Sequence, residues 1–194
     1  MKSIILIFAT LILSLPALSQ GGHDHGSHDH GSHDHGSSSK KVERHINSTT
    51  VKNKATTAIV DGYLKIKNAL VADDQKAAAK GGKALLSAFA KFNTKKLTKD
   101  QKKEYLEILE NAKEQAEHIT KNPIDHQREH FEVLSEDIND LIALVGTNKT
   151  LYQDFCPMAS DGKGAIWLSE YKDIKNPFFG KKMPKCGKMQ KQIN

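Results

Sequence analysis

Apolar residues between positions 50 and 146 recur with the period of an α-helix. In four successive stretches they lie three or four positions apart, which places them on one face of a helix. Because only short connections join the four stretches, the pattern predicts an antiparallel four-helix bundle. The four sets are Ile59, Tyr63, Ile66 and Leu70; Leu85, Phe89 and Phe92; Tyr105, Ile108, Leu109, Ala112, Ala116 and Ile119; and Phe131, Leu134, Ile138, Leu141, Ile142 and Val145.

The residues at the ends of these stretches suit helix ends. The first helix is expected to end near Asp73, and Asp73 or Asp74 is expected to cap the second. The third opens with a capping-box pattern over residues 98–101. The fourth begins with Pro123 as its first helical residue and stops at Gly146.

Two adjacent glycines, Gly81 and Gly82, interrupt the second helix. Each costs ~1 kcal/mol relative to Ala inside a helix. We therefore expect either close packing of another helix at this point or a break.

The segment from residue 147 to 194 differs in character, because prolines and glycines punctuate it. It predicts turns and a short hairpin around residues 164–168. Trp167, Leu168, Phe178 and Phe179 require burial, so we expect the segment to pack on the bundle. The predicted fold is mainly α, with a bundle over residues 50–146 and residues 147–194 completing the same domain.

The first nineteen residues have the pattern of a secretory signal peptide. Lys2 precedes the apolar run Ile4–Ile12, and Ala17, Leu18 and Ser19 form a small-residue cleavage site. We expect a periplasmic or secreted protein with no stable membrane insertion after cleavage. The alternative is an uncleaved anchor, for which the run is short.

Residues 20–49 form a leader rich in His, Asp, Gly and Ser. A five-residue unit, His-Asp-His-Gly-Ser, occurs three times in it. The repeats contain no aliphatic side chain whose burial could offset the entropy lost on ordering, so the leader is expected to be disordered. Neutral imidazoles bind Zn, Cu(II) and Ni, so the leader is predicted to capture metal weakly. The alternative is that it serves as a solubilising spacer. The histidines are His23, His25, His28, His30, His33 and His35.

Charge and motifs argue against nucleic-acid binding and against catalysis. The formal net charge is +6, and residues 156–194 carry eight Lys against three acidic residues. The lysines are scattered, and no helix-turn-helix or stacking-aromatic motif accompanies them, which favours a solvated surface. The sequence also has no phosphate-binding Gly-rich loop, HExxH or GxSxG motif. We therefore expect a protein that is not an enzyme.

Sulfur is concentrated in the last 39 residues. Both cysteines of the chain lie there with three of its four methionines, as Cys156-Pro157-Met158 and as a run that repeats sulfur every third residue. Sulfur ligands favour Cu(I) and Ag(I), whereas a zinc site would usually show CxxC pairs. We expect copper, with silver or zinc as alternatives. The candidate ligands are Cys156, Met158, Met183, Cys186 and Met189.

Histidines of the predicted bundle are additional candidates. His126 and His130 lie four residues apart, one turn apart on the same helix face. His118 lies near the end of the preceding helix, close to the same end of the bundle. Taken singly, each fits a hydrogen-bonded imidazole, but beside a sulfur-rich tail His126 and His130 become candidate metal ligands.

Two other functions fit the cysteines. A disulfide between Cys156 and Cys186 would close a loop worth ~3 to 4 kcal/mol and staple a helical module that binds a protein partner. A thiol enzyme would instead need one Cys with a markedly lowered pKa.

A set of motifs lies at residues 69–74, 127–131 with 134–136, 156–159, 164–169, 174–180 and 182–187. These motifs resemble a domain of unknown function of secreted bacterial proteins, which also occurs as a C-terminal extension of copper and silver efflux adaptors. The resemblance covers residues 50–190 and implies a periplasmic heavy-metal-binding module that handles copper, with efflux components as candidate partners. It also implies Cys156, Met158, Met183 and Cys186 as ligands, then His130. This chain lacks the lipoyl and barrel regions of the adaptors.

The leading hypothesis is thus a periplasmic copper-binding or copper-relay protein. Its sulfur-rich tail would hold Cu(I) against the bundle, and its leader would capture metal loosely.

Overall fold

The computed structural model describes residues 51–194. The predicted signal peptide and the leader with its six histidines lie outside the described residues and stay predictions. Within the described part, no helix is both long enough and apolar enough to cross a membrane.

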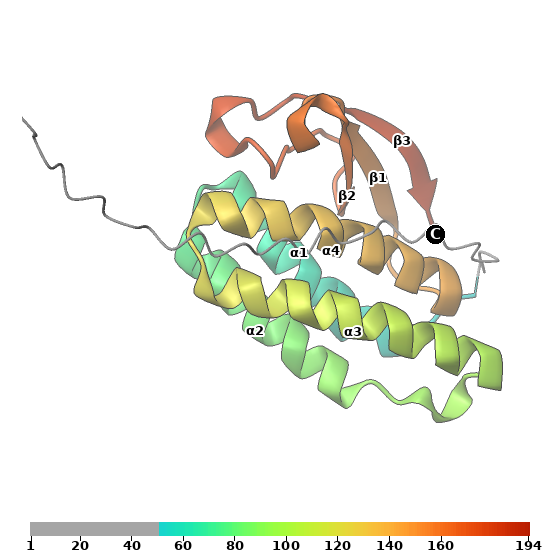
Figure 1. The fold of residues 1–194 in the computed structure, drawn as a ribbon. Helices are drawn as coiled ribbons and strands as arrows, with labels where there is room; N and C mark the ends of the chain where they lie inside the picture. Colours follow the sequence, from blue (N-terminus) through green and yellow to red (C-terminus); the bar gives the residue numbers. More distant parts are fainter. Residues whose placement is uncertain (1–50) are drawn as a thin grey trace, which may run out of the picture. The chain divides into compact units, whose positions relative to one another are not determined.

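Four helices form the body of the protein. They are α1 (Thr57–Val71), α2 (Gln75–Lys91), α3 (Lys99–Lys121) and α4 (Ile124–Val145), with α1 packed on α2 and α3 on α4 (Figure 1). The apolar faces expected from the sequence meet in one core, in which the residues predicted to face inward are buried, except that Phe92 and Leu109 are only partly buried. The mainly α fold class is therefore confirmed.

The helix ends follow local chemistry. The Asp74 carboxylate accepts a hydrogen bond from the backbone N–H of Ala77 at 2.9 Å, and Thr98 forms a capping box with Gln101. Pro123 is the residue before α4 and not its first helical residue, because its ψ of 162° is extended. Gly146 ends α4 as expected.

The Gly81-Gly82 pair marks a close helix contact and not a break. A Cβ on Gly81 would lie 2.8 Å from the backbone nitrogen of Ile66 on α1, and one on Gly82 would lie 2.9 Å from Thr120 Cγ2 on α3. Helix α2 thus approaches both of its neighbours across positions that have no side chain.

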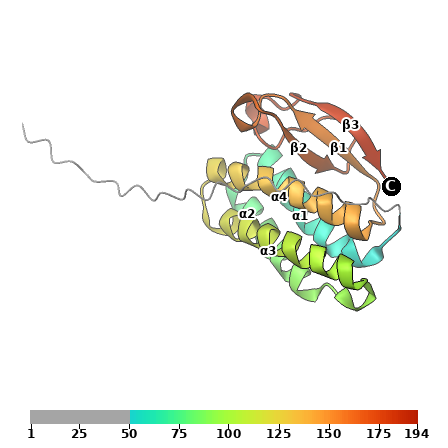
Figure 2. The same ribbon diagram turned by 45° about the vertical axis from the view of Figure 1, so that its right-hand side comes forward.

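The tail forms an antiparallel sheet with the strand order β2-β1-β3. Its strands are β1 (Leu151–Cys156), β2 (Ala165–Ser169) and β3 (Lys188–Ile193). The predicted hairpin is the β1–β2 pair, and β3 is an additional strand. The sheet lies against α4 and α1 (Figure 2), where Trp167 is fully buried as expected.

Hydrogen bonds and an ion pair join the sheet to the bundle. The Tyr63 hydroxyl lies 2.8 Å from Ser135 Oγ of α4 and accepts a hydrogen bond from the backbone N–H of Leu168 at 3.0 Å. Burial raises the pKa of this tyrosine well above its ordinary range. Beside it, the fully buried ammonium of Lys67 lies 2.7 Å from the Glu170 carboxylate. Helix α1 therefore fixes the position of β2.

Arg128 of α4 forms a second connection to the tail. Its Nε donates to the carbonyl of Pro177 at 3.1 Å, and its Nη2 donates to the carbonyl of Leu70 at 3.2 Å. The same Nη2 lies 2.5 Å from Asp73 Oδ1 and helps to lower the pKa of that carboxyl. One guanidinium thus links α4, the end of α1 and the loop before β3.

A buried carboxyl group lies in the central strand. Asp154 is 0% exposed, and neither of its oxygens has a hydrogen-bond partner. Burial raises its pKa to about 7, against a smaller lowering by the charge of Lys67.

The glycine contact gives a testable expectation. Gly81→Ala should lower the free energy of unfolding by about 1–3 kcal/mol, because the new methyl group meets the α1 backbone. Helix propensity alone predicts a gain of ~1 kcal/mol. Urea unfolding measures the change, and Ser87→Ala at an exposed position of α2 is the control. An increase in stability would show that the helices are not in close contact at Gly81.

The buried carboxyl predicts a pH-dependent stability. Because the pKa of Asp154 is about 7 in the folded chain and ordinarily 3.8, the folded chain keeps a proton that the unfolded chain has released between those pH values. This group therefore removes stability as the pH rises through that window. Asp154→Asn should raise Tm more at pH 8 than at pH 5. The exposed Asp173→Asn variant should change Tm equally at both, and an equal change for Asp154→Asn would contradict the assignment.

Candidate metal centre

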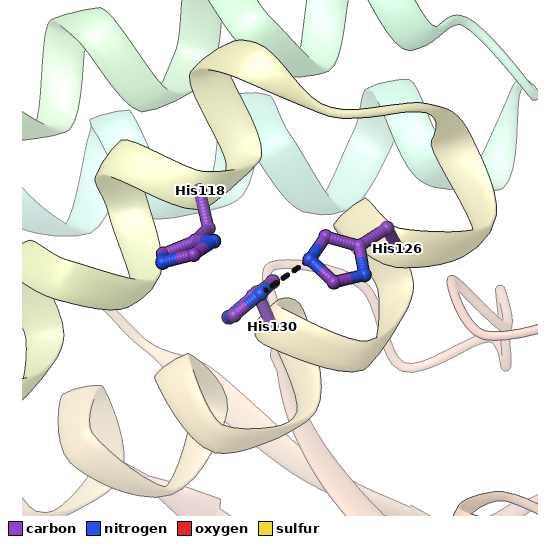
Figure 3. Close-up of side chains that lie close together, drawn as sticks. All are labelled: His118, His126 and His130. Atoms are coloured by element: carbon purple, nitrogen blue, oxygen red, sulfur yellow. Dashed lines mark hydrogen bonds between the residues drawn. The ribbon is translucent and has the colours of Figure 1, made fainter. Parts of the chain in front are cut away.

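Three histidines meet where α3 turns into α4. Helix α3 ends at Lys121, and the Asn122 side chain donates to the carbonyl of His118 at 2.9 Å. Pro123 then begins the return of the chain, so the last turn of α3 lies beside the first two turns of α4. His118, His126 and His130 face one another there, with candidate ligand atoms within 4.8 Å of each other (Figure 3).

The two histidines of α4 are the closest pair. Their Nε2 atoms lie 2.9 Å apart, and the rings meet edge to face. His118 stacks on His130 with ring centroids 4.1 Å apart. All three are half-buried, and 40% of the His126 side chain is exposed, so the cluster is open to solvent.

A relay of hydrogen bonds fixes the tautomer of His130. The carboxylate of Asp137 can only accept, so the Asn111 amide turns its NH₂ toward it, at 2.9 and 3.1 Å from the two oxygens. The Asn111 oxygen then faces the NH₂ of Gln115 at 3.4 Å. This leaves the Gln115 oxygen 2.6 Å from His130 Nδ1, which must carry the proton. His130 Nε2 is therefore a bare lone pair.

A carboxylate has the same effect on His126. Its Nδ1 lies 2.9 Å from a Glu129 oxygen, which places a proton on Nδ1. Its Nε2 lies 2.9 Å from the Nε2 of His130, at hydrogen-bond distance, so one proton lies between the two nitrogens. A metal ion bound by both nitrogens would take the place of that proton.

The surroundings of His130 oppose its own protonation. Burial, together with the neighbouring His118 and His126, lowers the pKa of His130 to about 4. The lone pair of His130 Nε2 consequently stays available to an ion over the physiological pH range.

The donor set suits a first-row transition metal of borderline hardness. Imidazole is a common ligand of Zn, Cu and Ni, and three histidines with an open position form a known metal geometry. Metal–nitrogen bonds of about 2.0–2.1 Å allow one ion to join two nitrogens up to ~4.2 Å apart. The His126–His130 pair meets this limit, and His118, whose ring stacks on that of His130, would have to turn its ring to add a third nitrogen.

The structure brings the two cysteines together, and they do not belong to the histidine cluster. Cys156 and Cys186 are free thiols with Sγ atoms 3.4 Å apart, and their hydrogen bond raises the pKa of Cys186. Met158 and Met189 are exposed by 55% and 47% of their surface, and Met183 is half-buried. Among residues 51–194 the close group of three or more His, Cys, Asp or Glu contains histidines alone. His126 and His130 therefore lie with His118 and not with the thiols.

The sequence pointed to part of this centre. The i, i+4 spacing of His126 and His130 identified the pair, and the expected helix connection placed His118 at the same end without selecting it as a ligand. Gln115, Asn111 and Asp137 were not identified. A polar residue on a helix is ordinarily a surface residue, so only the contact between α3 and α4 shows their role.

The shifted pKa predicts how His130 titrates. In metal-free protein its imidazole should stay neutral, with the proton on Nδ1, until the pH falls to about 4. Because the pKa is lower in the folded chain than in the unfolded chain, the group contributes stability that is lost as the pH falls from ~6.5 toward 4. Imidazole nitrogen NMR measures both the pKa and the tautomer. A midpoint near 6.5 would contradict the assignment.

The helical region resembles a known protein family. No curated protein and no solved structure matches the chain. A family model matches residues 59–150, which span nearly all of the four helices and stop before the strands, so Cys156 and Cys186 lie beyond the match. The family is described as a protein of unknown function, DUF3347, and the predicted resemblance to a domain of unknown function is thereby confirmed for the helical bundle.

Proposed function

We propose that this is an exported metal-binding protein that binds or relays copper, and that His118, His126 and His130 form its metal centre. The observation that carries the proposal is the group of three imidazoles, in which the Nε2 atoms of His126 and His130 lie 2.9 Å apart. Both Nε2 atoms are oriented by partners on the far side of the rings, Gln115 for His130 and Glu129 for His126. This is the arrangement of outer hydrogen bonds that accompanies metal-binding histidines.

Copper is the favoured ion for two reasons. Among divalent first-row metals, Cu²⁺ binds a given nitrogen site most tightly. The tail of the same chain also carries thiols, which suit Cu(I). Zinc is the competing ion at a site of three histidines.

The site suits transfer of the ion to a partner. Three protein ligands leave a coordination position open, and the half-exposed rings allow a donor or acceptor to approach. The proposed role is binding and delivery, with copper efflux components as candidate partners, and it includes no catalytic step.

A titration with Cu²⁺ and Zn²⁺ tests the proposal. It uses the full chain with the six leader histidines replaced by Asn, so that the leader does not contribute. We expect one ion per chain by calorimetry and native mass spectrometry, and loss of that binding in His126→Ala and in His130→Ala. Unchanged binding in both variants would reject this centre.

The outer hydrogen bond provides a finer test. Gln115→Leu should weaken metal binding by about 10- to 100-fold, because His130 loses the partner of its Nδ1–H. Glu114→Leu is the matched control, since Glu114 is exposed on the same turn of α3. Equal affinities for the two variants would show that Gln115 does not orient a ligand.

One observation favours a second function, a disulfide-stapled helical module that binds a protein partner. The Cys156 and Cys186 sulfurs are 3.4 Å apart, close enough for a small movement to join them. That function predicts oxidised protein without free thiols that binds neither copper nor zinc at the histidines.

A further inference from the structure

The two thiols lie where β1 ends and β3 begins. Cys156 is the last residue of β1, and Cys186 precedes β3, which pairs with β1 in antiparallel register. Between Cys186 and β3, Gly187 has a φ of +135°, and a Cβ there would lie 2.8 Å from Trp167 Cη2. Only glycine lets the chain pass this closely over the indole and place Cys186 beside Cys156.

A buried asparagine holds the loop that carries Cys186. Asn176 is 0% exposed, and its side-chain NH₂ donates to the carbonyl of Cys186 at 2.7 Å. Its backbone N–H donates to the carbonyl of Pro184 at 3.0 Å. Its side-chain oxygen accepts from the backbone N–H groups of Phe178 and Phe179. Cys186 is thus positioned by a satisfied internal network and does not belong to a loose terminus.

The ligand chemistry of this pair differs from that of the histidines. Metal–sulfur bonds of about 2.3 Å allow one ion to join two sulfurs up to ~4.6 Å apart, and these two lie 3.4 Å apart. Within the described part of the chain, no His, Asp or Glu completes a close group of three with the thiols. A structural zinc site normally needs four ligands. Two sulfurs without oxygen or nitrogen ligands suit a soft monovalent ion of low coordination number.

We propose that Cys156 and Cys186 form a second metal site, specific for a soft monovalent cation, so that one chain holds Cu(I) at the thiols and Cu(II) at the histidines. That the cation is copper rests on the proposed function, whereas the dithiol geometry stands without it. Binding replaces the two thiol protons with one ion, and no electron is transferred. Met183 starts the turn closed by the Cys186 N–H, and Met158 lies two residues beyond Cys156 along the chain.

Silver is the probe, because Ag⁺ is soft and does not oxidise thiols to disulfides as Cu²⁺ does. Reduced full chain with the leader histidines replaced by Asn is titrated with Ag⁺ without oxygen. We expect one Ag⁺ per chain and protection of both thiols from a thiol reagent. The fluorescence of Trp167 should change with the same endpoint, because the only Trp of the chain lies against Gly187.

Variants separate the two sites. Cys186→Ser, at a half-exposed position, should lose the bound Ag⁺ and the fluorescence change but keep Cu²⁺ binding at the histidines. His126→Ala should do the reverse. If Cys156→Ser fails to fold, it is left out of the test. Cys186→Ser, and thiol protection in the chain that keeps both cysteines, then show whether the thiols bind Ag⁺.

Two results would overturn this second site. One is thiols that stay fully reactive in the presence of Ag⁺. The other is protein isolated from the periplasm with no free thiol, whose Cu²⁺ binding is normal and which binds no Ag⁺ after reduction. Either result would leave the histidine centre intact, and loss of Cu²⁺ binding alone would leave the thiol site intact.

Discussion

A carboxylate accepts hydrogen bonds and cannot donate them, and this constraint orients the polar side chains that lead to His130. Asp137 fixes the Asn111 amide, which fixes Gln115, which places the proton of His130. The relay crosses from α4 to α3 and back, so it exists only when the two helices are packed in this register. The packing of the helices therefore sets the tautomer of His130, and it does so before any ion binds.

The packing of the helices and the sheet depends on glycines, which have no side chain, and on buried polar groups that have hydrogen-bond or ion-pair partners. Gly81 and Gly82 let α2 contact α1 and α3 closely, which holds the four helices as one body. Tyr63 and Lys67 then attach the sheet to α1 through a hydroxyl and an ammonium that have partners in the interior. The two groups of potential ligands consequently lie on different parts of one folded unit. The imidazoles lie on the α3–α4 hairpin, and the thiols lie where β1 ends and β3 begins.

Sequence patterns predicted what depends on local chemistry. Helical periodicity, the caps at Asp74 and Thr98, and the i, i+4 spacing of His126 and His130 all act within a few residues, so they could be recognised in the chain. Strand β3 could not, because its side chains are nearly all exposed and show no alternation of apolar and polar residues. The proximity of Cys156 to Cys186 was expected, as a disulfide or a shared metal site. The strand pairing that produces it was not, since it joins strands separated by 31 residues, from Cys156 to Lys188.

The first turns of α4 carry not only two of the histidines but also Arg128, which contacts the tail. It lies two residues before His130, and its guanidinium holds the carbonyl of Pro177, the neighbour of the asparagine that positions Cys186. Arg128 therefore ties the helix that carries His126 and His130 to the segment between β2 and β3 that carries Cys186.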